Sequence, residues 1–236
     1  MSTRFEELDW QETPMGVISL RRRRDPATGD DVHEVKLDDD YLMSSLFTVA
    51  EIAVAALALD RLSGTGWDVA VGGLGLGYTA RTVLESPDVR SLVVVEALPQ
   101  VIDWHRRGLV PLGAALSADA RCELREGDFL QSAVTSGINP GRRFHAVIVD
   151  IDHSPRHLLH PAHAAFYEAE GAGRLSEQLQ PGGVFALWSD DPPDAEYLAV
   201  LAAVFDDVVA EVVPFRSPGQ EGTSTNTVYL ATRRSV

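Results

Sequence analysis

The stretch Val69-Ala70-Val71-Gly72-Gly73-Leu74-Gly75-Leu76-Gly77 decides the fold of this chain. The apolar run 67–71 predicts a short buried strand, and the segment 78–85 predicts a helix directly after the glycines. Glycines at such a turn let the backbone adopt positive φ angles and approach a ligand closely, and the start of the helix offers free N–H groups. We therefore expect a ligand-binding turn between a strand and a helix.

Segments that predict strands and helices alternate on both sides of this turn. We expect buried strands at 67–71, 92–95, 122–125, 144–149 and 184–188, with helices at 46–62, 78–85, 99–107, 164–179 and 194–205. Such alternation is typical of a parallel sheet buried on both faces. Two closely spaced strands, 208–214 and 227–232, predict an antiparallel edge. The fold class expected is therefore α/β, with a Rossmann-like, doubly wound, mostly parallel sheet and an antiparallel edge strand.

The first part of the chain has a different pattern. Two strand-like runs, 15–24 and 31–37, are joined by a connector with Pro26 and Gly29, which predicts a β-hairpin. We interpret the run Arg21–Arg24 as charges on a solvated edge strand that prevent edge-to-edge pairing. The expected division is an N-terminal hairpin extension at 1–45 and a Rossmann-like domain at 46–236.

Composition and charge exclude some function classes. The formal net charge of −15 argues against nonspecific binding to nucleic acid, and it suits either a cationic ligand or ordinary solubility. We found no apolar run of membrane-spanning length and no secretory signal pattern, and the single Cys122 excludes an internal disulfide. A cytoplasmic protein with no nucleic-acid or membrane partner is expected.

Acidic residues follow three of the expected strands, where ligands bind in open parallel sheets. Glu96 is placed to accept hydrogen bonds from two ribose hydroxyls, or to stabilise the start of the next helix. Asp128 could contact the amine of a base, or cap the segment from Phe129. Asp150 ends a strongly apolar strand at the mouth of the sheet, or forms a turn. A dinucleotide fingerprint is disfavoured because Tyr78 occupies its third glycine position.

Five ordered motifs resemble the spermidine synthase-like aminopropyltransferases, which share the class I methyltransferase fold. They are Val69-Ala-Val-Gly-Gly73, Val93-Val-Val-Glu96, Glu126-Gly-Asp128, Val147-Ile-Val-Asp150 and Leu179-Gln-Pro-Gly-Gly-Val184. The resemblance covers residues 14–232. It implies that S-adenosylmethionine or its decarboxylated form is the cofactor. It also implies that Gly72, Gly73, Gly75 and Gly77 line this cofactor, that Glu96 holds the ribose, that Asp128 contacts the adenine, and that Asp150 is the catalytic acid–base residue.

The acceptor region departs from the family pattern. Residues 38–47 contain Tyr41 and several acids, but lack the family's Gln and its His-Glu pair. After Asp150 the family motif D-S-S/T-D-P is replaced, so that the second acid, Asp152, is displaced by a position. Asp190 ends the next strand on the same rim and would either add acidity for a cationic acceptor or start a loop. Tyr41, Asp152 and Asp190 are the candidate substrate residues.

Four histidines crowd the loop after Asp150, at His153, His157, His160 and His163. A metal site is one interpretation of this spacing. Prolines in the segment argue against a single helix that presents the ligands, so we expect no metal. A loop that gates the site is the favoured interpretation.

Three hypotheses about function follow. The first is an alkyl transferase acting on an amine, with aminopropyl transfer and Asp150 as general base. The second is a methyltransferase acting on a small molecule, and the third is a non-catalytic nucleoside-binding homologue. A small cationic amine is the expected partner in the first case. The hairpin, with the apolar residues Trp10 and Phe47, could also mediate a homodimer.

Overall fold

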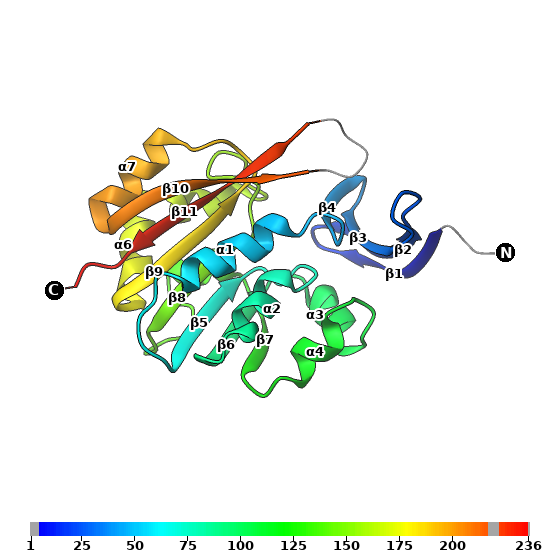
Figure 1. Ribbon diagram of the computed structural model, residues 1–236, viewed down its shortest axis with the longest axis horizontal. Helices are drawn as coiled ribbons and strands as arrows, with labels where there is room; N and C mark the ends of the chain where they lie inside the picture. Colours follow the sequence, from blue (N-terminus) through cyan, green and yellow to red (C-terminus); the bar gives the residue numbers. More distant parts are fainter. Residues whose placement is uncertain (1–4, 217–221, 236) are drawn as a thin grey trace.

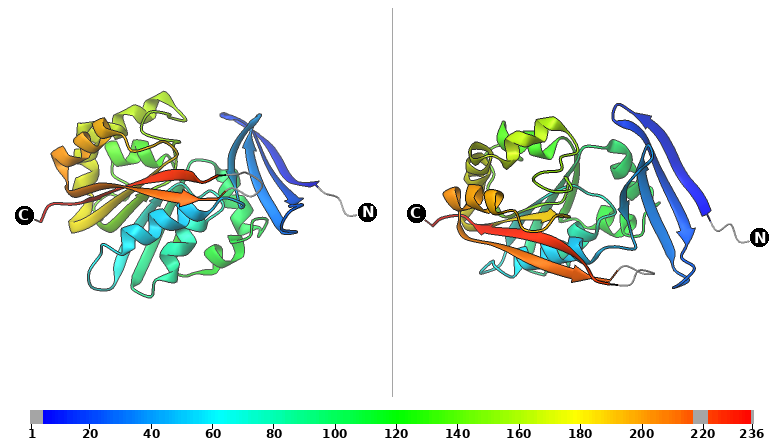
Figure 2. Two further views of the ribbon diagram at one scale, coloured as in Figure 1. Left: turned by 45° about the horizontal axis from the view of Figure 1, so that its top comes forward. Right: turned by 90° about the horizontal axis from the view of Figure 1, so that it is seen from above.

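The computed structural model describes residues 5–216 and 222–235. They form a four-stranded antiparallel sheet, in the order β1-β2-β3-β4, and a seven-stranded sheet, in the order β10-β11-β9-β8-β5-β6-β7. Figure 1 shows the small sheet at the N-terminal end of the molecule and the large sheet with its helices at the other end. The two views in Figure 2 show the strands of the small sheet standing across the end of the large one.

The strands are β1 (Phe5–Thr13), β2 (Gly16–Arg24), β3 (Asp31–Leu37), β4 (Asp40–Ser44), β5 (Trp67–Gly72), β6 (Val89–Glu96), β7 (Cys122–Glu126), β8 (Phe144–Val149), β9 (Leu179–Ser189), β10 (Asp206–Phe215) and β11 (Ser224–Thr232). The helices are α1 (Val49–Leu59), α2 (Tyr78–Glu85), α3 (Pro99–Arg106), α4 (Gly113–Ala118), α5 (Phe129–Val134), the 3₁₀ helix η1 (Pro161–Tyr167), α6 (Ala169–Glu177) and α7 (Ala195–Val204). Of the described helices, none is long and apolar enough to cross a membrane.

The order of the large sheet confirms the predicted fold class. Strands β5, β6, β7, β8 and β9 pair in parallel, whereas β11 is antiparallel to both β9 and β10. The chain moves outward from β5 to β6 and β7, and then returns to place β8 on the other side of β5. This reversal makes the carboxyl ends of β5 and β8 the switch point of the sheet, where open α/β sheets bind their ligands.

Each face of the large sheet has its own hydrophobic core. One core includes buried residues of α1 to α4, and it continues into the small sheet through Ile18, Leu20 and Val35. The other includes residues of α5, η1, α6 and α7. All six residues of β5 are buried because both faces are covered, which explains why Val69, Ala70 and Val71 follow one another without a polar residue.

The N-terminal region contains more than the predicted hairpin. Strands β2 and β3 form that hairpin, and β1 and β4 extend it on either side. The interpretation of Arg21–Arg24 as an edge strand was wrong, because β2 lies inside the sheet between β1 and β3. Arg21 and Arg23 both pair with the buried carboxylate of Glu34 on β3, so these charges hold the sheet together.

The predicted helix at 164–179 was also wrong in its extent. Residues 161–167 form η1, and the chain is extended at Glu168 before α6 begins. The backbone of Ala165 and Phe166 lies against Gly171, where a side chain would overlap it. Strand β9 already begins at Leu179. The short helices α4 and α5 were not predicted, because six residues are too few to show a helical period.

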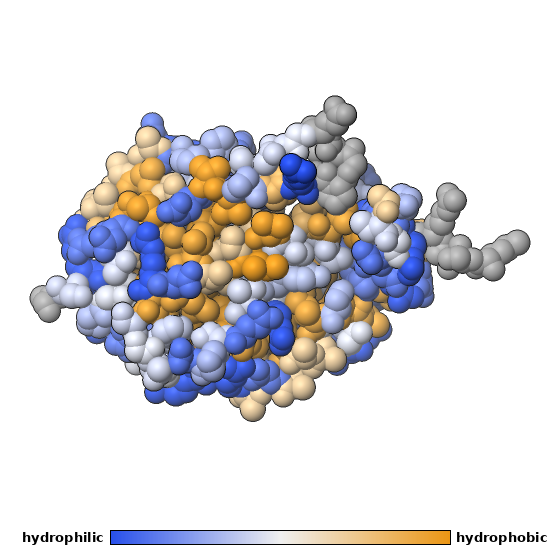
Figure 3. Space-filling model, viewed as in Figure 1, coloured by the Kyte–Doolittle hydropathy of each residue, from blue (hydrophilic) through white to orange (hydrophobic). Residues whose placement is uncertain are grey.

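Apolar side chains also lie on the surface of the molecule. Figure 3 shows them gathered in the middle of the face viewed in Figure 1, over α1 and β10. Val49 and Ile52 on α1 and Val212 on β10 are exposed. Trp10 and Phe47, which were named above for a homodimer, are 50% and 41% exposed.

Asp68 on β5 links neighbouring segments at the amino end of the large sheet through hydrogen bonds. Its buried carboxylate accepts hydrogen bonds from Arg90, from Ser91 (2.5 Å) and from Arg142 (2.8 Å). Burial alone would raise the pKa of Asp68, but these three donors together hold it well below its usual value. The charged form of Asp68 therefore stabilises the fold.

We expect Asp68→Asn to lower the free energy of unfolding by about 2 kcal/mol at pH 7, because it leaves two guanidinium groups without their partner. A lowered pKa stabilises the fold above the ordinary carboxyl pKa, so the difference from the wild type should shrink as the pH falls below about 4. Urea unfolding at several pH values measures this. Asp103→Asn, in an exposed pair with Arg107, is the control and should cost less than about 0.5 kcal/mol. Equal losses would contradict the assignment.

Candidate active site

A cavity of about 810 Å³ lies at the carboxyl ends of the central strands and extends to the small sheet. Most of the residues predicted for the site line it: Gly73, Gly75, Gly77, Glu96, Asp128, Asp150, Tyr41 and Asp190. Gly72 and Asp152 are not in its lining. The topology therefore brings together the glycine turn, the strand-end acids and part of the N-terminal sheet.

The glycines of the turn are required by close packing within the protein. Gly73 has a φ of +91°, and a Cβ there would overlap the backbone oxygen of Asp150. Gly77, at φ +94°, packs against Leu116 and His105 in the same way. Gly72 is extended and lies against the ring of Phe129. Packing within the protein therefore excludes larger residues at these positions, whether or not a ligand is bound.

Glu96 connects the turn to the next helix. One carboxylate oxygen accepts from the backbone N–H of Leu74, and the other accepts from that of Leu98, both at 2.9 Å. Burial raises the pKa of Glu96, although the backbone donors oppose this effect. Glu96 thus fixes the glycine turn against α3 while it also lines the cavity.

Asp128 caps α5, as one of the two interpretations of the sequence proposed. Its Oδ1 accepts from the backbone N–H of Gln131 at 2.9 Å. The residue lines the cavity as well, on the side of β6 and β7. Capping and ligand contact are therefore compatible at this position.

Asp150 and Glu51 are half-buried residues whose carboxyl groups share the cavity. Asp150 follows β8, and its Oδ2 accepts from the hydroxyl of Thr79 at 3.0 Å. Burial raises the pKa of Asp150 to about 6. Burial and the negative charge of Asp150 raise the pKa of Glu51, on α1, to about 8. Two carboxyl groups in one cavity thus hold their protons at much higher pH than exposed ones, as is common at functional sites.

Two residues of the site were missed by the sequence analysis. Glu51 had one signal, because it is an acid within the otherwise apolar start of α1. His105 on α3 had none. Its fully buried ring places Nε2 3.0 Å from the carbonyl oxygen of Gly75, and burial lowers its pKa. Because a carbonyl oxygen only accepts hydrogen bonds, Nε2 of His105 bears the proton and donates it to Gly75. This hydrogen bond stabilises the glycine turn.

Asp152 has a structural role in this arrangement. Its carboxylate accepts from the backbone N–H of Leu159 (2.8 Å), from His163 Nδ1 (2.8 Å) and from the hydroxyl of Tyr167 (2.9 Å). The residue is only 1% exposed. These contacts organise the loop after β8 and leave Asp152 outside the lining of the cavity.

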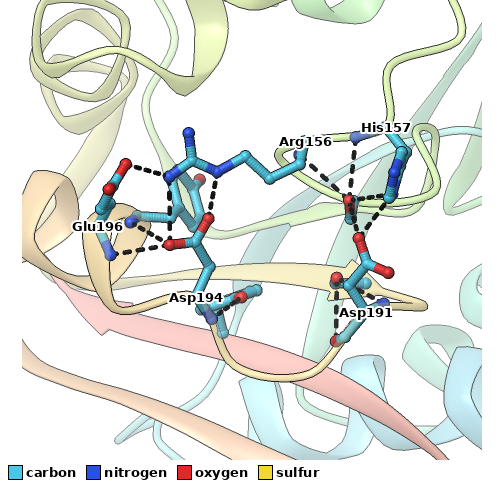
Figure 4. A network of polar contacts seen from close by, with 9 residues as sticks. Arg156, His157, Asp191, Asp194 and Glu196 are labelled. Atoms are coloured by element: carbon cyan, nitrogen blue, oxygen red, sulfur yellow. Dashed lines mark hydrogen bonds and ion pairs between the residues drawn. The ribbon is translucent and has the colours of Figure 1, made fainter.

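The loop after β8 is tied to the segment after β9, as Figure 4 shows. Ser154 Oγ and His157 Nδ1 both contact Asp191 Oδ2, at 2.6 and 2.7 Å. Arg156 contacts Asp194 and Glu196 at the start of α7. The other three histidines of this loop, at 153, 160 and 163, line the cavity. Across the described residues, no group of three or more His, Cys, Asp or Glu side chains is arranged to hold a metal ion.

The two remaining candidates lie on the rim. Asp190 is exposed and accepts from Asn226 Nδ2 at 2.8 Å. Tyr41 on β4 is exposed, and its hydroxyl contacts Arg21. The ring of Tyr41 also lies under Arg21 and near Lys36, at 4.8 and 5.2 Å from their charged groups. The structure therefore places both candidates at the entrance to the cavity.

Comparisons with known proteins agree with this geometry. No family model matches the chain. Polyamine aminopropyltransferase 2 of Pseudomonas aeruginosa is 31% identical over 154 residues, which are 60% of this chain and only 40% of that protein. Spermidine synthase from Thermotoga maritima has a TM-score of 0.70 at 16% identity, covering 98% of this chain and 73% of that one.

A further spermidine synthase, solved in complex with the transition-state analogue AdoDATO, has a TM-score of 0.72 at 17% identity. That match covers 98% of this chain and 74% of the solved one. Identities this low show the fold alone. The chain has the fold of the spermidine synthases.

Proposed function

We propose that this protein is an alkyl transferase that moves a group from an adenosyl-sulfonium donor to an amine, with aminopropyl transfer from decarboxylated S-adenosylmethionine as the first choice. The observation that supports it most is the carboxyl pair of Glu51 and Asp150, both with a raised pKa, in the same cavity as the glycine turn. The similarity to polyamine aminopropyltransferase 2 gives independent support.

The nucleoside half of the donor fits the turn and the strand ends. Gly73, Gly75 and Gly77 offer backbone without side chains. Glu96 is positioned for the ribose hydroxyls, since each of its oxygens can accept more than one hydrogen bond. Asp128 is positioned for the adenine amine. In this proposal Gly72, the last residue of β5, leads into the turn that binds the donor.

The charges of the cavity favour a donor without a carboxylate. The described residues that line it include no Lys or Arg. They do include the acids Glu51, Asp150 and Asp190. A carboxylate on the donor would face these acids, and no Lys or Arg among the described lining residues would neutralise it. The decarboxylated donor replaces that charge with a hydrogen, so the proposal prefers it.

The reaction needs alignment and one proton acceptor. The amine nitrogen attacks the carbon bound to the positive sulfur, from about 3–3.5 Å. The new C–N bond forms as the C–S bond breaks, and the electron pair of that bond leaves with the sulfur as a neutral thioether. The carboxylate of Asp150 takes the proton from the nitrogen, a step that typically contributes about 10²–10⁴-fold.

Methyl transfer from S-adenosylmethionine is the second candidate. The N-terminus of α2 directly follows the glycine turn, and its free N–H groups could hold the carboxylate of that donor. The two candidates differ in the nucleoside that remains: methylthioadenosine after aminopropyl transfer and S-adenosylhomocysteine after methyl transfer.

The direct test is incubation with each sulfonium donor and a panel of amines, with the nucleoside by-product identified by mass. We expect methylthioadenosine from the decarboxylated donor. Asp150→Asn should lower kcat by about 10²-fold or more, since the proton acceptor is lost. Asp60→Asn, an exposed acid after α1, is the matched control. Absence of any by-product, or an unchanged rate in Asp150→Asn, would contradict the proposal.

The pH dependence tests the carboxyl pair. Activity should rise through about pH 6 as Asp150 loses its proton. A further rise in affinity for a cationic amine should follow near pH 8, where Glu51 becomes charged. Glu51→Gln should keep the first step and lose the second, because a neutral Glu51 and Gln present the same charge near pH 6.

Stability gives a second measurement for the same pair. Both groups have a raised pKa in the folded state, so the wild type should lose stability as the pH rises through about 6 and about 8. Glu51→Gln removes the upper of these losses. Its Tm relative to the wild type should therefore be higher at pH 9 than at pH 6, and a constant difference would contradict the assignment.

A further inference from the structure

We propose that the amine acceptor has a single ammonium group and an apolar body, and is not an extended di- or polyamine. This inference rests on the proposed function and concerns the acceptor part of the same cavity. It combines three observations about the described residues: the apolar wall supplied by the small sheet, the engagement of nearby acids with protein groups, and the carboxyl pair of Glu51 and Asp150 in the same cavity.

The small sheet and the loop after it form an apolar wall of the cavity. Its members share an aliphatic, thioether or aromatic side chain: Met15, Leu37, Leu42, Met43 and Phe47. Leu159, Trp188 and Phe215 add to this character from the large sheet and its loops. Such a lining suits the hydrocarbon part of a ligand and offers no carboxylate to an ammonium group.

Two acids that could hold a second ammonium are already occupied. Glu34 lines the cavity, but its two oxygens pair with Arg21 and Arg23 at 2.8 and 2.7 Å. Asp152 is buried under the loop with three hydrogen-bond donors of its own. Neither carboxylate is free to neutralise a ligand charge.

Among the described residues, Glu51, Asp150 and Asp190 are the acids that remain for the acceptor. Glu51 and Asp150 share one part of the cavity, and the mechanism assigns Asp150 to the reacting amine. Asp190 lies at the exposed rim with one oxygen bound to Asn226. A second ammonium could thus meet Asp190 only at the exposed rim, where water weakens the charge pair, and deeper in the cavity it would lie against the apolar wall.

Matched amines test the inference: pentylamine against 1,5-diaminopentane, and butylamine against 1,4-diaminobutane, with the donor established by the by-product assay. We expect kcat/KM to be at least about tenfold higher for the monoamine of each pair, because the second ammonium would be desolvated without a partner. A preference for either diamine would overturn the inference and leave the proposed function standing. No by-product with any amine would overturn both.

Changes in the wall give a second, independent readout. Phe47→Glu places a carboxylate on it at a partly exposed position, and should shift the preference by about tenfold toward the diamines. Phe47→Leu keeps the wall apolar and should preserve the preference for monoamines. If both variants behave alike, the wall does not select the acceptor and the inference fails.

Discussion

The close contact between Gly73 and the backbone of Asp150 is the constraint on which the rest of the site depends. Strands β5 and β8 are parallel neighbours, and the N–H of Asp150 donates to the carbonyl of Gly72 at 2.9 Å. A glycine at positive φ is the residue that fits beside this peptide. The contact places the glycine turn next to the carboxylate of Asp150, so that one cavity could hold both reactants of the proposed reaction.

The small sheet and α1 complete this cavity from the other side. Glu51 faces Asp150 at the start of α1, only a few residues after the small sheet ends. Burying two carboxyl groups in one cavity costs stability at high pH, because each is then more stable protonated. Carboxyl groups that lower the stability of the fold in this way are typical of sites that bind cations or transfer protons. This is the basis of the proposed amine chemistry.

Much of the large sheet could be predicted, because its buried strands are continuous apolar runs and the glycine turn starts α2 at Tyr78. The small sheet was harder: β1 is polar and β4 is short, so neither has a clear period. The contacts of Asp152 depend on how the loop after β8 folds back on itself, and that of His105 depends on the glycine turn earlier in the chain, so no local pattern contains them. The assignment of Glu96 and Asp128 to a ligand stays a prediction, since both also have structural roles.

The central claim is that Gly73 allows the donor turn and Asp150 to meet. Isothermal titration of methylthioadenosine into Gly73→Ala and Gly64→Ala tests it most directly, because both positions have positive φ but only Gly73 is crowded. Each variant should lose about 1–2 kcal/mol of stability from the backbone strain. The account predicts that Gly64→Ala binds like the wild type and that folded Gly73→Ala binds at least about tenfold more weakly. Equal binding by the two variants would contradict it.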